Sequence, residues 1–153
     1  MEMEEKVPAN LKHIPILKIN GYAHIDGNYR KKTDARGLSI GLAQWNGEGE
    51  NDISAKVWRY VNGRWSRQSE ELPLHRVLDL AFLICASINY SHTGVQSELE
   101  GKPIEEDQNN PHIETHLLIL KNKLRTLIDI SSPGDDLDGR LKRLSAELKK
   151  IGY

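Results

Sequence analysis

Two runs of alternating residues joined by Asn62-Gly63 predict a β-hairpin over residues 53–67, ISAKVWRYVNGRWSR. Both central residues of a type I′ turn need positive φ, which Asn and Gly tolerate, so this dipeptide between alternating runs is a strong hairpin signal. The turn sets the register, and Tyr60 should therefore pair with Trp65. One face then carries Lys56, Trp58, Tyr60, Trp65 and Arg67, and the opposite face carries Ile53, Ala55, Val57 and Val61.

Two more segments in the first half of the chain have the pattern of strands. HIPILKI, residues 13–19, predicts a short strand in which Pro15 marks an edge or a strand start. Residues 38–45 alternate between the apolar Leu38, Ile40 and Leu42 and the smaller Ser39, Gly41 and Ala43. If Trp45 pairs with Asp52, Ser39 lies beside Trp58, and small residues next to large ones form a shallow concavity.

The period changes to that of a helix in the second half. Apolar residues recur every three or four positions over residues 74–90, and Pro73 suits the first turn of that helix. We expect this helix to cover the apolar sheet face of Leu38, Ile40, Leu42, Ala55 and Val57. Asn110-Pro111 is a plausible cap for a second helix over residues 113–127, although THLLILK also fits a buried strand. SSPGDD then breaks the chain before a last helix with a stripe of Leu137, Leu141, Leu144, Leu148 and Ile151.

These elements predict an α+β fold, with an antiparallel sheet of three to four strands in the N-terminal half followed by about three helices. Residues 1–10 are expected to be a flexible lead-in and residues 11–153 a single domain. The polar, acidic segment 91–110 is long for a connection inside a compact domain, so we expect a lid or a flexible excursion there.

The composition is that of an ordinary soluble protein. A net charge of −1 with 28% charged and 38% hydrophobic residues makes nucleic acid an unlikely partner, so any basic site must be local. Cys85 is the single cysteine, which excludes an internal disulfide and favours a reducing compartment. No apolar run approaches the roughly 18 residues of a membrane span. We therefore expect a cytoplasmic location without a membrane partner.

The aromatic and basic face of the hairpin is the main candidate for a binding site. Trp and Tyr rings stack on nucleobases and other aromatic ligands, and Lys and Arg bind phosphates. The loop that contains Arg30, Lys31, Lys32 and Arg36 could close over the same surface and add cations. The alternative is that a helix covers this face, so that its aromatic residues form a second core layer with the cations at the rim.

No residue pattern assembles a catalytic set. Ser39, Ser54 and Ser66 lie in predicted strands without the strand-turn-helix context of a nucleophile elbow. His112 and His116 share a helix face at a spacing that can chelate a metal, but two surface histidines are the more ordinary interpretation of this spacing. We therefore predict no catalytic residues, no metal site and no cofactor.

The runs DARGLSIGLAQWN, DISAKVWR and WSRQSEELPLHRVLDLA, together with the final KKIGY, carry a family resemblance. They resemble a small family of bacterial proteins known only as a domain of unknown function. The resemblance implies a bacterial or phage cytoplasmic context and no particular activity, cofactor or site residue.

The sequence thus favours binding over catalysis. The predicted ligand is small and phosphorylated or aromatic, such as a nucleotide, held by Lys56, Trp58, Tyr60, Trp65 and Arg67 with the help of the basic loop. The alternative is a protein-interaction module, a homodimer built by the leucine stripes of the last two helices. A metal-dependent enzyme that uses the histidine pair is the third hypothesis.

Overall fold

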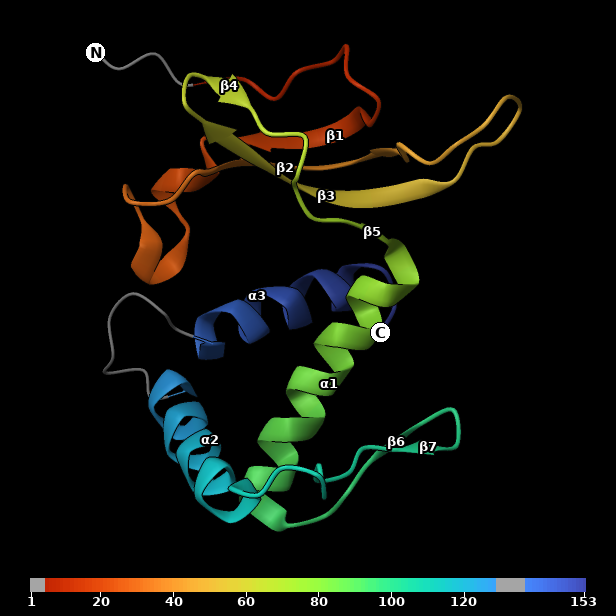
Figure 1. The fold of residues 1–153 in the computed structure, drawn as a ribbon. Coiled ribbons are helices and arrows are strands. Elements are labelled where there is room, and N and C mark those ends of the chain that lie inside the picture. Colours follow the sequence, from red (N-terminus) through yellow and green to blue (C-terminus); the bar gives the residue numbers. More distant parts are fainter. Residues whose placement is uncertain (1–4, 129–136) are drawn as a thin grey trace. The chain divides into compact units, whose positions relative to one another are not determined.

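The computed structural model describes residues 5–128 and 137–153. Its contacts divide the chain into two compact units, Met1–Leu80 and Ala81–Tyr153, here called unit 1 and unit 2. The described elements confirm the α+β class, because an antiparallel sheet in the N-terminal half precedes three helices (Figure 1). The single domain predicted for residues 11–153 stays a prediction.

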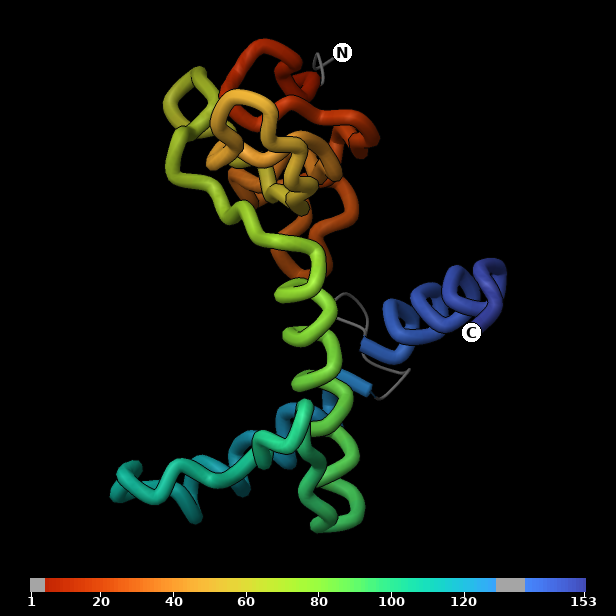
Figure 2. Tube along the Cα trace, turned by 90° about the vertical axis from the view of Figure 1, so that its right-hand side faces the viewer, coloured from red at the N-terminus to blue at the C-terminus, as the bar shows by residue number. Residues whose placement is uncertain are grey.

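Unit 1 is built on one antiparallel sheet with the order β1-β2-β3-β4, and β5 pairs with β3. Seen along its strands, this sheet is strongly curled (Figure 2). Its strands are β1 (Ile14–Asn20), β2 (Ala35–Leu42), β3 (Ile53–Val61), β4 (Arg64–Trp65) and β5 (Glu71–Pro73). Two short 3₁₀ helices, Tyr22–His24 and Gly27–Tyr29, lie in the connection from β1 to β2.

The predicted hairpin is confirmed. Tyr60 pairs with Trp65 and Val61 with Arg64, and Asn62 and Gly63 both have positive φ, 52° and 77°. The ladder continues for one hydrogen bond, from the Ser66 amide to the Arg59 carbonyl at 2.7 Å. Beyond it the Val57 amide donates to the Glu70 carbonyl. The pairing of β5 with β3 is therefore shifted by two residues from the register of the hairpin.

The predicted register between the second and third strands is wrong by two residues. Ser39 lies opposite Lys56, and the ladder ends where Leu42 faces Ile53. The connecting loop explains the difference, because the Asn46 side chain bonds both the amide and the carbonyl of Asp52 at 3.0 Å. Side-chain hydrogen bonds of this kind compete with ladder pairing, so the loop closes on itself.

The two sheet faces are used in the opposite way to the prediction. On β2 and β3 the buried positions are those of Ser39, Ser54, Lys56 and Trp58, together with small residues. The apolar face predicted to be core is more open: Ile40 is 39% exposed. This outer face forms a depression of about 520 Å³ whose walls include Leu38, Ile40, Ala55, Val57 and, from the first turns of the following helix, Val77.

Glycines permit the curl of the sheet. A Cβ at Gly37 would lie 2.3 Å from the Val7 side chain, and one at Gly41 would lie 2.0 Å from the Ile14 carbonyl oxygen. Val7 is buried and its amide donates to the Asn20 side chain at 2.8 Å. The Val7 side chain thus fills the space that Gly37 leaves, and the flexibility expected of residues 1–10 stays a prediction.

The predicted helices are confirmed as α1 (Leu74–Thr93), α2 (Ile113–Ile128) and α3 (Leu137–Lys150). The predicted cap of α2 is present, because the Asn110 side chain accepts from the His112 amide at 2.9 Å. The excursion 91–110 contains a small hairpin of β6 (Glu98–Leu99) and β7 (Lys102–Pro103). The predicted break at 131–136 lies outside the described residues. Among the described helices, none is long and apolar enough to cross a membrane.

Replacing Gly41 with alanine should destabilise unit 1, because the new Cβ would collide with the backbone of β1 rather than with a movable side chain. Overpacking of this kind costs about 1–3 kcal/mol of unfolding free energy, which urea denaturation can measure. Gly47→Ala is the matched control, since its Cβ would meet only the flexible Glu50 carboxylate at 3.0 Å. Equal stability of the two variants would contradict the close approach of β1 and β2.

Candidate functional site

The inner face of the curled sheet holds a group of polar side chains with almost no exposure to solvent. Trp58 and Ser54 are 0% exposed, and His13 and Ser39 are 1% and 5% exposed. We call this group the enclosed cluster: His13, Ser39, Ser54, Lys56, Trp58 and Glu71. Buried polar groups must be paired to be tolerated, so the bonding of this cluster decides what it can do.

Strand register brings the members of the cluster together. Lys56 on β3 lies opposite Ser39 on β2 and opposite Glu71 on β5. Ser54 and Trp58 share the face of Lys56, because side chains two apart on a strand point the same way. His13 immediately precedes β1, which enters the sheet beside the end of β2.

His13 connects two sides of the cluster through its two ring nitrogens. Nε2 lies 2.8 Å from Ser39 Oγ, and Nδ1 lies 2.5 Å from Glu71 Oε1 and 3.0 Å from Ser54 Oγ. The carboxylate requires a proton on Nδ1, so Nε2 of a neutral ring is an acceptor. The Trp58 indole N–H donates to Ser39 Oγ at 2.8 Å, which leaves the Ser39 proton directed at His13 Nε2.

The electrostatics of the cluster are dominated by burial. Burial lowers the pKa of His13 below its usual range; the hydrogen bond and the charge of Glu71 oppose this shift, and the charge of Lys56 adds to it. Burial also lowers the pKa of Lys56, again opposed by Glu71. The Lys56 ammonium lies 4.4 Å from the centroid of the Trp58 ring, a cation–π contact.

Glu71 uses its two carboxylate oxygens very differently. Oε1 accepts hydrogen bonds from the Ser54 hydroxyl at 2.8 Å and the Gln44 amide at 3.1 Å, in addition to His13. Oε2 is buried and has no hydrogen-bond partner among the described residues. A buried carboxylate oxygen without a partner is costly, so its place in the fold calls for an explanation.

Trp58 and Lys56, predicted as exposed ligand contacts, are 0% and 7% exposed and belong to the enclosed cluster; their role in ligand binding stays a prediction. The small residues of β2 leave room for the indole, so the concavity predicted beside them is filled by the Trp58 ring. Trp65 and Tyr60 remain half-buried. Their rings meet edge to face at 5.1 Å, and Trp65 meets the edge of Trp58 at 5.9 Å.

The predicted basic loop reaches the same hairpin close to its turn, at Tyr60. The Tyr60 amide donates to the Asp34 carbonyl at 2.8 Å, and Arg59 binds the carboxylates of Asp34 and Glu70. These two carboxylates raise the pKa of Arg59. We define the hairpin surface as Tyr60, Trp65 and Arg67 with Arg30, Lys31 and Lys32, of which Arg67 and the three loop cations are exposed.

Arg36, the fourth predicted loop cation, is already engaged. Its guanidinium donates to both oxygens of Glu5, at 3.0 and 3.1 Å, and to the Thr33 carbonyl at 3.2 Å. Arg36 therefore holds the N-terminal segment to the sheet, and its charge is already paired with that of Glu5.

The histidine pair in unit 2 has a local role. The ring centroids of His112 and His116 lie 5.8 Å apart, and His116 Nδ1 is 2.9 Å from Nδ2 of the Asn110 side chain. Within residues 5–128 and 137–153, no group of three His, Cys, Asp or Glu side chains could hold a metal ion. Two imidazoles without a further ligand make a weak metal site.

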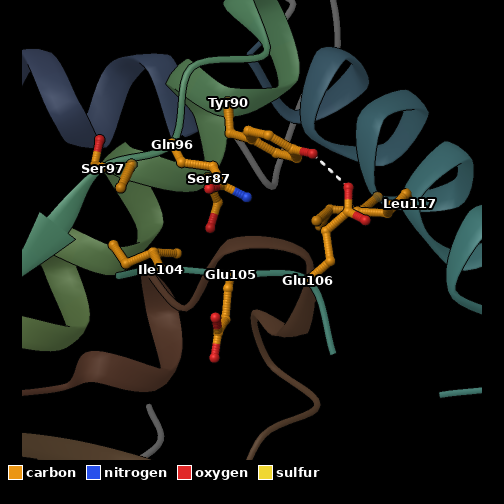
Figure 3. Close-up of a pocket in the computed structure, with 10 residues that line it drawn as sticks. Ser87, Tyr90, Gln96, Ser97, Ile104, Glu105, Glu106 and Leu117 are labelled. Carbon is orange, nitrogen blue, oxygen red and sulfur yellow. Dashed lines mark hydrogen bonds between the residues drawn. The ribbon is translucent and has the colours of Figure 1, made fainter. Parts of the chain in front are cut away.

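Unit 2 also has a small cavity of about 110 Å³ between α1, α2 and the segment that carries the β6–β7 hairpin (Figure 3). The Tyr90 hydroxyl donates to Glu106 across it, and this hydrogen bond raises the pKa of Tyr90. Leu117, Leu120, Ile104 and Ala86 make much of the remaining wall. The cavity is too small for a nucleotide-sized ligand.

Sequence reasoning missed His13 and Glu71 as members of a site and set Ser39 and Ser54 aside as strand serines. His13 precedes a strand and Glu71 lies just before Pro73, and neither belongs to a recognisable motif. The available signal was the shared face of Ser39, Ser54, Lys56 and Trp58, which the alternation predicts once the register is known.

Fold and site together define a small α+β protein whose curled antiparallel sheet encloses a polar cluster. The chain belongs to DUF6530, a family of unknown function, whose model matches residues 5–153. This match confirms the predicted membership of an uncharacterised family. No protein of curated function and no solved structure matches the chain.

Unfolding free energy should fall as the pH is lowered from 7.5 to 5, in part because of His13. Its pKa is lower in the folded state, so the unfolded chain binds the proton first. The contribution is fully present above the unfolded pKa, about 6.5, and is lost as the pH falls through the folded value. Denaturation at several pH values should show a shallower loss in His13→Gln than in the wild type.

His24→Gln is the control for this measurement, because His24 is exposed and lies outside the enclosed cluster. The slope of stability against pH is compared rather than the absolute stability, since His13→Gln also removes hydrogen bonds. An identical slope in wild type and His13→Gln would show that His13 is not held neutral by burial.

Proposed function

We propose that the chain is a binding protein for a small anionic ligand with an aromatic part, such as a nucleotide, at the hairpin surface. The observation that carries this proposal is the hydrogen bond between the Tyr60 amide and Asp34, which joins the aromatic hairpin to the basic loop. Aromatic faces and nearby cations are the pair of features that recognise such ligands.

The aromatic side chains of the hairpin surface pack on a buried neighbour, Trp58. Trp58 is fully buried and its ring meets Trp65 edge to face, so Trp65 rests on a fixed neighbour. A preordered ring loses little conformational entropy on binding, which favours affinity. In this proposal Trp65 and Tyr60 contact the ligand, and Trp58 supports them from inside the sheet.

The charge at the hairpin surface comes from cations that remain exposed. Arg30, Lys31, Lys32 and Arg67 are exposed, whereas Arg59 is taken up by Asp34 and Glu70. Exposed cations supply long-range attraction that weakens with salt. Binding should therefore depend on ionic strength, and the single cysteine and the family resemblance support a bacterial cytoplasmic context for it.

The alternative function, a homodimer through the leucine stripes of α2 and α3, stays a prediction. Leu144 and Leu148 are 44% and 39% exposed, which is compatible with either a free or a covered stripe.

Nucleotides should raise the melting temperature of the wild type, more at low than at moderate salt, because a ligand that binds only the folded state stabilises it by mass action. Trp65→Ala should weaken the binding of the best nucleotide by about 1–3 kcal/mol, the usual contribution of one stacking contact. Thermal unfolding against a nucleotide and sugar-phosphate panel, followed by titration calorimetry, measures both.

Trp45→Ala is the matched control, since it removes an exposed indole that lies in the loop between β2 and β3, hydrogen-bonded to Asp52, and away from the hairpin surface. Its affinity should equal that of the wild type. No shift with any compound in the panel, or an equal loss in the two variants, would overturn the hairpin surface as a binding site.

A further inference from the structure

We propose that Ser39, His13 and Glu71 form a nucleophilic centre for the hydrolysis of small carboxylic esters, with Lys56 facing the negative charge that develops. This activity is separate from ligand binding at the hairpin surface. All four side chains belong to the enclosed cluster; the contacts of Ser39, His13 and Glu71 define their roles, and the strand register defines that of Lys56.

Ser39 and His13 have the geometry of a nucleophile and its base. Their Oγ and Nε2 atoms are 2.8 Å apart, within the range for direct proton transfer. The Trp58 N–H can only donate, so it occupies a lone pair of Ser39 and orients the hydroxyl proton toward Nε2. Burial keeps His13 neutral and therefore able to accept that proton near pH 7.

Glu71 is the positioning residue of the centre. Its Oε1 lies 2.5 Å from His13 Nδ1, which fixes the tautomer with a free Nε2 and stabilises the imidazolium that forms during reaction. Ser54 and the Gln44 amide hold the same oxygen. Hydrogen bonds from Gln44, just after β2, and from Ser54 on β3 therefore hold the carboxylate in the orientation that contacts His13.

Lys56 is the cation closest to the nucleophile in the strand register. It lies directly opposite Ser39 across β2 and β3, and opposed side chains on one face of a sheet have Cβ atoms about 4.5–5.5 Å apart. A buried ammonium in this position can stabilise an oxyanion more strongly than one in water.

The reaction balances with an ester and water alone. Ser39 Oγ attacks the ester carbonyl carbon while its proton moves to His13 Nε2, and the resulting oxyanion faces Lys56. When the intermediate collapses, the C–O bond to the alcohol breaks and His13 returns the proton to the alcohol. Water, deprotonated by His13, then attacks the acyl-serine, and release of the acid returns the proton to Ser39.

The burial of Ser39 limits the size of the substrate, and its contacts show which side chains cover it. Ser39 is only 5% exposed and bonds the edge of Trp58, which in turn contacts Trp65 on the hairpin. Strand β4 has two residues and two paired positions, and one more ladder hydrogen bond joins Ser66 to Arg59, so opening this short hairpin breaks few backbone hydrogen bonds. In this proposal Trp58 covers Ser39 and Trp65 covers Trp58, so both indoles must shift to admit a substrate, and the centre suits esters with a small acyl group, such as acetyl.

Phenylmethylsulfonyl fluoride, a small serine reagent, tests the centre directly. Its sulfonyl group should bond to Ser39 Oγ as fluoride leaves, and intact mass with peptide mapping should locate one adduct there. The adduct should be lost in Ser39→Ala and His13→Gln, form at least about tenfold more slowly in Glu71→Gln, and form faster in Trp65→Ala because the cover is opened. p-Nitrophenyl acetate hydrolysis should follow the same order.

Ser91→Ala is the matched control, because Ser91 lies outside the enclosed cluster and its hydroxyl donates to the Ser87 carbonyl of α1 at 2.9 Å; this variant should form the Ser39 adduct at the wild-type rate. Circular dichroism confirms that each variant is folded. The absence of an adduct on Ser39 in folded wild type and folded Trp65→Ala would overturn the proposal, as would an unchanged labelling rate in His13→Gln. Failure of nucleotide binding leaves this result unaffected, so the two proposals can fail separately.

Discussion

The hydrogen bonds to one oxygen of Glu71 hold unit 1 together at its centre. Oε1 receives His13 from the start of β1, the Gln44 amide from just after β2, and the Ser54 hydroxyl from β3. Hydrogen bonds to a charged group contribute about 1.5–3 kcal/mol each, and removal of the acceptor would leave two buried donors, His13 and Ser54, without this partner. The conformation of the sheet and the chemistry of the cluster therefore depend on the same carboxylate.

The local elements could be predicted because each has its own signal. Asn62-Gly63 sets the hairpin, and apolar residues at helical spacing set α1, α2 and α3. The use of the two sheet faces could not be predicted, since alternation favours the side of Leu38 and Val57 as core. The side that is buried depends on Gly37 and Gly41, which leave space for Val7 and for the backbone of β1. These contacts join residues far apart in the sequence, so no local pattern predicts them.

The candidate site was predictable only in part, for a related reason. Lys56, Trp58, Tyr60 and Trp65 follow one another on a single hairpin, so their shared face follows from period two. His13 is 26 residues from Ser39 and 58 from Glu71, and only the register of four strands brings these residues together. A two-residue error between β2 and β3 was enough to place Ser39 beside Trp58 instead of Lys56.

Trp58 connects the two proposals physically. Its N–H bonds Ser39 inside the sheet, while its ring edge contacts Trp65 at the hairpin surface. A ligand that stacks on Trp65 favours the closed position of the hairpin, whereas a substrate of Ser39 requires the open one. Ligands that prefer opposite states of one element reduce each other's affinity. Occupation of the hairpin surface would therefore inhibit the enclosed centre, and the sign of this coupling follows from the position of a single indole.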